Sequence, residues 1–163
     1  MTKDAQLPPL LKVLISADGT ISNMLEAWFN EAVAAQVVQT TAPVSDHDLL
    51  MLDASPGDEV ICRSTQIVGK STATTYLRAS AVILAERVPA QTLACIEKHE
   101  AGIGKALRQA RSETLREVLD WGIDEQNNEV WRCYRIVMNG QPVMLITEHF
   151  PITTYGSHNE LRQ

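Results

Sequence analysis

The 163-residue sequence has few cysteines, no cluster of basic residues and no long apolar run. Its three cysteines, Cys62, Cys95 and Cys133, form no CxxC pair, which argues against a zinc site or a disulfide framework and predicts reduced thiols. Lysine and arginine are dispersed and the net charge is −6, so no surface for nucleic acid or anionic membrane is expected. No stretch approaches the roughly 18 apolar residues of a spanning helix, and no signal peptide is recognisable. We therefore expect a cytoplasmic protein without a membrane span.

What is present fits a globular chain. An apolar content of 45% and a charged content of 21% are ordinary values, and the length suits one domain with a real core. We expect a single domain over residues 1–163, with about 1–10 and 157–163 loose at the two ends.

Apolar spacing divides the chain into helical and extended segments. Thr20 or Ser22 can cap a helix, and the segments 90–100 and 105–111 also have a helical pattern. Residues 37–58 look irregular or contain a short strand. Alternation of period two predicts strands over 59–68, 72–88 and 129–150, the last a hairpin turning at Asn139-Gly140. Residues 112–123 suit a helix or a strand. The fold class expected is α+β, an antiparallel sheet with helices packed on one side or end.

The segment "VMLITEHFP", residues 143–151, contains a carboxylate among apolar side chains. Alternation puts four side chains on one face of this strand: Met144, Ile146, Glu148 and Phe150. An unpaired carboxylate in an apolar interior is costly. Either the strand ends near residue 147 and Glu148 lies at a wet rim, or Glu148 faces a cavity that holds a cation, a hydroxyl or a ligand.

Two arginines repeat this pattern on other strands. Arg63 shares a face with Ile61, Thr65 and Ile67, and Arg78 shares a face with four neighbours: Tyr76, Ser80, Val82 and Leu84. Each arginine alone could lie along the sheet and reach water. Two arginines and one glutamate on inward faces instead indicate a pocket for an anion that also carries a hydroxyl, since the guanidinium fork matches a carboxylate.

The same residues resemble the chorismate pyruvate-lyase (4-hydroxybenzoate synthase) family, with its chorismate lyase or UTRA-like fold. The likeness runs from "SADGTISNMLEAWF" to "TEHFP". It rests on Arg63, on Arg78 fifteen residues later, on "GIGKAL" beside the family's "PLG" loop, and on the terminal hairpin "NGQPVMLITEHFP". Two departures are the "AGIG" in place of "PLG" and His149 in place of an apolar residue.

The resemblance implies a site and a reaction. Arg63 would hold the ring carboxylate, Glu148 would meet the ring hydroxyl, and Arg78 would lie in the pocket, on the enolpyruvyl carboxylate or the leaving pyruvate. Flaps near Thr20 and Ile21, and around Ile103 and Gly104, would line it. The resemblance also favours a strand over 112–123. The reaction would be loss of pyruvate from chorismate to give 4-hydroxybenzoate for ubiquinone synthesis, with Glu148 and Arg63 as catalytic residues and no metal or other cofactor.

A binding role without catalysis is the alternative. The same fold serves as the effector domain of GntR-type regulators, which bind an aromatic or sugar acid. Little chain precedes the first helix, which weakens the option of a DNA-binding domain there. The four histidines have no metal-ligand spacing, and no nucleophile elbow or P-loop is present. The expected partner is in either case a small carboxylate.

Overall fold

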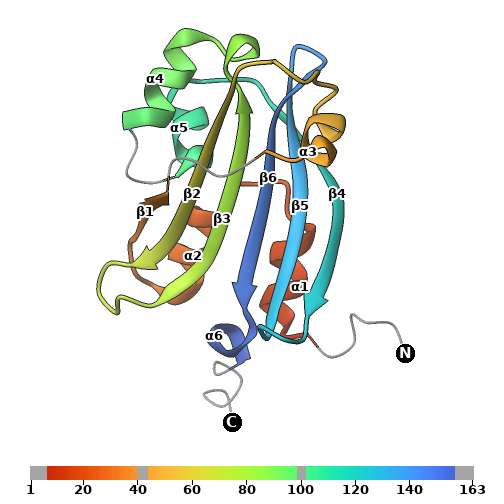
Figure 1. The fold of residues 1–163 in the computed structure, drawn as a ribbon. Coiled ribbons are helices and arrows are strands. Elements are labelled where there is room, and N and C mark those ends of the chain that lie inside the picture. Colours follow the sequence, from red (N-terminus) through yellow and green to blue (C-terminus); the bar gives the residue numbers. More distant parts are fainter. Residues whose placement is uncertain (1–6, 40–43, 99–101, 157–163) are drawn as a thin grey trace.

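The fold is a six-stranded antiparallel sheet with helices on its faces and at one end. It is seen in a computed structural model, which describes residues 7–39, 44–98 and 102–156. The strand order is β1-β2-β3-β6-β5-β4, and every neighbouring pair is antiparallel. Figure 1 shows α1 and α2 behind the sheet and α4 and α5 near one end of it. The expected α+β class with a single antiparallel sheet is confirmed.

The elements follow the chain with short connections. The strands are β1 (Val33–Gln39), β2 (Val60–Gly69), β3 (Thr75–Leu84), β4 (Leu115–Asp124), β5 (Glu129–Met138) and β6 (Gln141–Pro151). The helices are α1 (Pro9–Ser16), α2 (Ile21–Phe29), α3 (Asp46–Met51), α4 (Ala90–Lys98), α5 (Ile103–Gln109) and α6 (Ile152–Gly156), with a 3₁₀ turn, η2, at Ala85–Arg87.

Local sequence explains most of these boundaries. Asn139 and Gly140 both have positive φ, 49° and 75°, as the tight turn between β5 and β6 requires. Ser45 and Asp48 form a reciprocal capping box that starts α3 within the region expected to be irregular. The ambiguous segment 112–123 contains strand β4, so the choice that the resemblance favoured is confirmed.

The inner face of the sheet carries two apolar clusters. One lies under α1 and α2 and includes Leu14, Leu25 and Phe150; the other lies under α4 and α5 and includes Ile136 and Met144. Because β6 contributes to both clusters, the stretch of strand between them is where polar groups interrupt the core.

The N-terminal expectation is wrong in part. Helix α1 begins at Pro9, a favourable first helical residue because it needs no N–H partner, and Leu7 and Leu10 are buried. Burial of these leucines anchors the start of the chain to the sheet. The rest of the segments expected to be loose, 1–6 and 157–163, lies outside the described residues.

Glu31, just after α2, ties the β2–β3 turn to the body of the domain. Its carboxylate accepts hydrogen bonds from the Tyr76 hydroxyl, from the Ser71 N–H and from the N–H and hydroxyl of Thr72. The bond from Tyr76, joined by those from Ser71 and Thr72, lowers the pKa of Glu31 from 4.5 to about 2.

We expect this carboxylate to make stability dependent on pH in the acid range. A carboxyl group whose pKa is depressed in the folded state stabilises it above the unfolded pKa, and that contribution is lost as the pH falls toward 2. The free energy of unfolding in urea should therefore fall between pH 5 and pH 2.5 by less in Glu31→Gln than in the parent. Identical pH profiles for the two proteins would contradict the assignment.

Candidate functional site

A cavity opens on the inner face of the sheet, between the two apolar clusters. It encloses about 570 Å³ not occupied by protein atoms, part of it open to solvent. On the side of the sheet, the small side chains of Ala79 and Ala81 of β3 line it. The start of α2 and the start of α5 form its walls. The polar side chains that line it include Ser22, Arg63, Thr65, Arg116, Tyr134 and Glu148.

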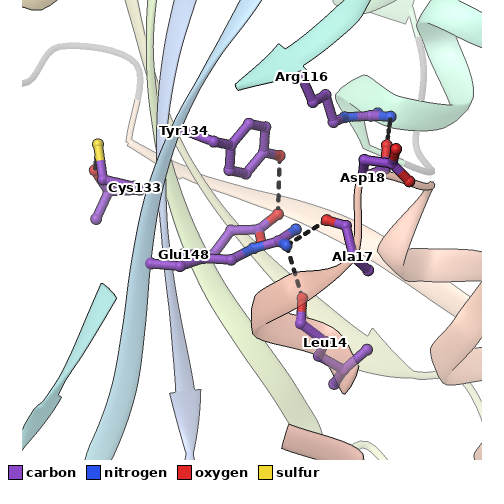
Figure 2. Close-up of polar contacts among 9 residues, drawn as sticks. Leu14, Ala17, Asp18, Arg116, Cys133, Tyr134 and Glu148 are labelled. Atoms are coloured by element: carbon purple, nitrogen blue, oxygen red, sulfur yellow. Dashed lines mark hydrogen bonds and ion pairs between the residues drawn. The ribbon is translucent and has the colours of Figure 1, made fainter. Parts of the chain in front are cut away.

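Glu148 is buried in this cavity and has protein partners. Only 6% of the residue is exposed, so the rim alternative is wrong. Arg132 Nε lies 2.7 Å from Glu148 Oε2, and the Tyr134 hydroxyl donates to Oε1 at 3.1 Å. Figure 2 shows the Tyr134 hydroxyl pointing to the Glu148 carboxylate, on the same side of the sheet as Leu14 and Ala17. Burial, with the nearby charge of Glu148, raises the pKa of Tyr134, which keeps its hydroxyl protonated as a donor.

Arg132 is the largest fully buried side chain among the described residues. Besides binding Glu148, Arg132 also binds the end of α1: its Nη1 donates to the carbonyls of Leu14 and Ala17 at 2.7 Å each (Figure 2). These carbonyls belong to the last turn and the C-cap of the helix, where the helix dipole favours a cation. Its guanidinium also lies 4.8 Å from the centre of the Tyr134 ring. Its charge is therefore well compensated, which fixes the carboxylate of Glu148 in place.

Arg63 is buried on the inner face, as alternation predicts, and lacks a counterion. Its Nη1 donates to the carbonyl of Ile96 at 2.7 Å, and its Nε is buried without a partner. No acidic side chain is paired with it in the part of the chain that the structure describes. Burial lowers the pKa of this guanidinium, although arginine stays protonated in proteins. A buried cation that lines a cavity without a counterion favours binding of an anion there.

Arg78 is not in the cavity, and its predicted place there is wrong. It is paired across the sheet with His149 and Gln66, so it lies on the outer face, half exposed, in an ion pair with Glu129. The inward side chains of β3 are instead those of Leu77, Ala79 and Ala81. Alternation identifies which residues share a face, but not which face is inside.

The sequence pattern of β3 suggested that the face of Arg78 is internal, because one end of this outer face is covered by other apolar residues. Leu84 packs in a third apolar cluster with Leu52 and Leu145, at the end of α3. Val82 contacts the same cluster. Val82 and Leu84 therefore belong to this outer cluster, whereas Tyr76 packs in the inner cluster under α1 and α2.

Two arginines that the sequence reasoning missed lie near Glu148. Arg132 is in register with Glu148, and Arg116 of β4 is in register with buried Ile136, so both point inward. Arg116 lines the cavity, and its Nη1 donates to the Asp18 carbonyl at 2.8 Å, as Figure 2 shows. Alternation along 129–138 would have found Arg132, because every second residue from Val130 to Met138 is buried. Arg116 had no such signal, since β4 is an edge strand whose alternation shifts at a bulge.

The other predicted residues also come together at the cavity. Ile21 begins α2, Ile103 begins α5, and Gly104 follows it, and all three line the cavity. Gly104 packs closely: a Cβ there would lie 3.1 Å from Thr20 Cγ2 and 3.3 Å from Arg116 Nη2. Their roles toward a ligand stay predictions.

Two further properties bear on the class of site. Among residues 7–39, 44–98 and 102–156, no group of three or more His, Cys, Asp or Glu side chains is arranged to hold a metal ion. Within the same ranges, no helix has the length and apolarity to cross a membrane.

Comparison with known proteins points to one enzyme family by sequence and to regulator domains by fold. No protein-family model matches the chain. The chain is 26% identical over 156 residues to a chorismate pyruvate-lyase of Mycobacterium tuberculosis (strain ATCC 25618 / H37Rv), a match covering 86% of this chain and 78% of that protein. It is 23% identical over 153 residues to a chorismate pyruvate-lyase of Mycobacterium leprae (strain TN), covering 86% and 73%.

Among solved structures, the chain is similar to PhnF from Mycobacterium smegmatis, with a TM-score of 0.58 at 11% identity. The match covers 83% of this chain but only 65% of PhnF; against the isolated effector domain of PhnF it covers 82% and 88%, with a TM-score of 0.57. At this identity the likeness concerns the fold alone. The resemblance proposed from the sequence is thus confirmed: over most of its length this chain is similar to chorismate pyruvate-lyases, and it has the fold of GntR effector domains.

Proposed function

We propose that this chain is a chorismate pyruvate-lyase that eliminates pyruvate from chorismate and releases 4-hydroxybenzoate, with no metal or other cofactor. The observation that carries the proposal is the charge of the cavity. Arg63 and Arg116 line the cavity without an acidic partner, and the carboxylate of Glu148 is neutralised by Arg132 behind it, which leaves an excess of two positive charges. Chorismate is a dianion with a ring hydroxyl, and it complements such a site.

The proposed reaction needs positioning more than chemical activation. The ether bond between ring carbon 3 and oxygen breaks, the hydrogen on ring carbon 4 is lost, and the methylene of the enolpyruvyl group gains a proton to become the methyl group of pyruvate. The ring becomes aromatic, so the step is downhill. A cavity that holds the dianion in the reactive shape, with little water, supplies the main requirement.

In this proposal, Arg63 and Glu148 bind the substituents at opposite ends of the substrate ring. Arg63, without a counterion, binds the ring carboxylate, and Glu148 accepts a hydrogen bond from the hydroxyl at the opposite ring position. Glu148 lies on β6, two strands from Arg63 on β2 and two residues further along, roughly 12 Å at the backbone. Long side chains reaching inward from these strands can span a six-membered ring and its two substituents.

The second candidate is a binding module that holds a small carboxylate without turning it over; it is supported by the likeness in fold to the effector domain of PhnF. Incubation of the purified chain with chorismate separates the two. An enzyme forms 4-hydroxybenzoate and pyruvate in equal amounts, before and after treatment with a chelator. Binding of chorismate with no product favours the module, and loss of activity on chelation that a divalent ion restores contradicts the metal-free mechanism.

Matched substitutions of the two predicted arginines provide a sharper prediction. Arg63→Met should lower kcat/KM for chorismate by roughly 10–150-fold, since a hydrogen bond to a charged group contributes about 1.5–3 kcal/mol. Its melting temperature should stay the same or rise, because the change removes a buried charge that has no acidic partner. Arg78→Met should leave turnover within about twofold, since Arg78 lies on the outer face. Equal losses of turnover in both variants would contradict the assignment of Arg63.

A further inference from the structure

A dianionic ligand needs a second cation in the cavity besides Arg63. Of the arginines near Glu148, Arg132 also has a buried nitrogen without a partner, Nη2, but it is unsuited, because it is fully buried, does not line the cavity and is already bound to Glu148 and to two helix carbonyls. The charge of Lys105 of α5 is already neutralised by an ion pair with Glu26 at 2.8 Å. Arg116 is the remaining cation that lines the cavity.

Arg116 has unused capacity for binding an anion. Its Nε is buried without a partner, and its hydrogen bond to the Asp18 carbonyl leaves the charge uncompensated. No acidic side chain is paired with it among the residues described. A guanidinium held in this state can donate to an incoming carboxylate without first breaking an ion pair.

The position of Arg116 fits a second carboxylate. Arg63, Glu148 and Arg116 lie on β2, β6 and β4, so Glu148 is between the two arginines in the order of the strands. A ring held by Arg63 at its carboxylate and by Glu148 at its hydroxyl points its next substituent toward β4. In chorismate the enolpyruvyl group is attached to the carbon beside the one that bears the hydroxyl.

We propose that Arg116 is the substrate-binding residue for the enolpyruvyl carboxylate, the group that leaves as pyruvate, and that it thereby distinguishes substrate from product. This inference rests on the proposed function, because it takes chorismate as the ligand. Gly104 is part of the arrangement, since a Cβ there would lie 3.3 Å from Arg116 Nη2 and 3.1 Å from Thr20 Cγ2, so that one of the two side chains would have to shift by a few tenths of an ångström. The same contact accounts for a glycine at the start of α5.

The test compares two ligands that differ in the second carboxylate. Binding of chorismate and of 4-hydroxybenzoate is measured by calorimetry on the parent, Arg116→Met, Arg63→Met and Arg78→Met. We expect Arg116→Met to weaken chorismate binding tenfold or more and to change 4-hydroxybenzoate binding by less than about threefold. Arg63→Met should weaken both ligands, and Arg78→Met neither. Arg116→Lys, which keeps the charge but not the fork, should fall between the parent and Arg116→Met for chorismate alone.

The outcomes separate this inference from the proposed function. If the parent binds chorismate without converting it and Arg116→Met selectively weakens that binding, the lyase proposal fails and the role of Arg116 stands. Equal weakening of both ligands in Arg116→Met, unchanged chorismate binding in that variant, or no chorismate binding by the parent would overturn the role of Arg116. A variant too unstable for calorimetry is replaced by Gly104→Ala, which should also weaken chorismate more than 4-hydroxybenzoate; equal weakening there would count against the inference.

Discussion

Arg132→Met should cost this protein about 3–5 kcal/mol of its free energy of unfolding, the typical loss when one partner of a buried ion pair is removed. The substitution leaves the Glu148 carboxylate, 6% exposed, with only the Tyr134 hydroxyl as a donor. It also leaves the carbonyls of Leu14 and Ala17 without the guanidinium that now binds them. For a chain of this length the loss corresponds to a fall in melting temperature of roughly 6–20 °C.

Arg135→Met in the same strand is the matched control. Arg135 is partly exposed on the outer face, where it pairs with Glu117 and Asp53 and donates to the Met51 carbonyl; because these groups are reached by water, its loss should cost about 1 kcal/mol. The double variant Arg132→Met with Glu148→Gln should be more stable than the sum of its single changes predicts, because the second change removes the charge that the first leaves unpaired. Urea unfolding of the parent and of the four variants, Glu148→Gln alone included, measures both effects. A loss for Arg132→Met no larger than for Arg135→Met would show that the buried pair does not hold α1 to the sheet.

Part of this fold could be predicted from local sequence, but β4 suited a helix or a strand, and α3 lies in a segment that was expected to be irregular. Period-two alternation and the Asn139-Gly140 turn define β5 and β6, and the same alternation correctly puts Arg63 and Glu148 inside. The face of β3 could not be read in this way. It depends on what packs against each side of the sheet, and the outer apolar cluster around Leu52 makes both faces of β3 apolar at that end.

The partner of Glu148 was open to sequence reasoning and was overlooked. The Glu148 carboxylate lies among apolar residues because its partner, Arg132, is on the neighbouring strand and in register with it. Pairing the two strands about the Asn139-Gly140 turn would have put Arg132 opposite Thr147, one residue away, because a register shift between Ile136 and Val137 is what brings Arg132 opposite Glu148. The role of α1 could not have been predicted, since it depends on a helix end more than a hundred residues away in sequence. Arg116 likewise reaches the site only through tertiary packing.

Glu148→Gln is expected to abolish most activity, lowering kcat/KM for chorismate by tenfold or more. An amide oxygen accepts a hydrogen bond from the ring hydroxyl more weakly than a carboxylate does and cannot take a proton. If the carboxylate had only a ligand as its partner, this variant should fold as well as the parent. The ion pair with Arg132 changes that expectation: the amide leaves a buried guanidinium without its counterion, so the free energy of unfolding should also fall.

Activity and stability must therefore be measured separately in this variant. Turnover is assayed well below the melting temperature of Glu148→Gln and expressed per folded molecule. Tyr134→Phe is the matched control, because it removes the other hydrogen bond to Glu148 at 3.1 Å and keeps the charge. We expect a smaller loss of turnover in Tyr134→Phe than in Glu148→Gln, since the carboxylate remains held by Arg132 at 2.7 Å. Turnover of folded Glu148→Gln within twofold of the parent would mean that the carboxylate serves only to neutralise Arg132, and that the hydroxyl of the substrate is bound elsewhere.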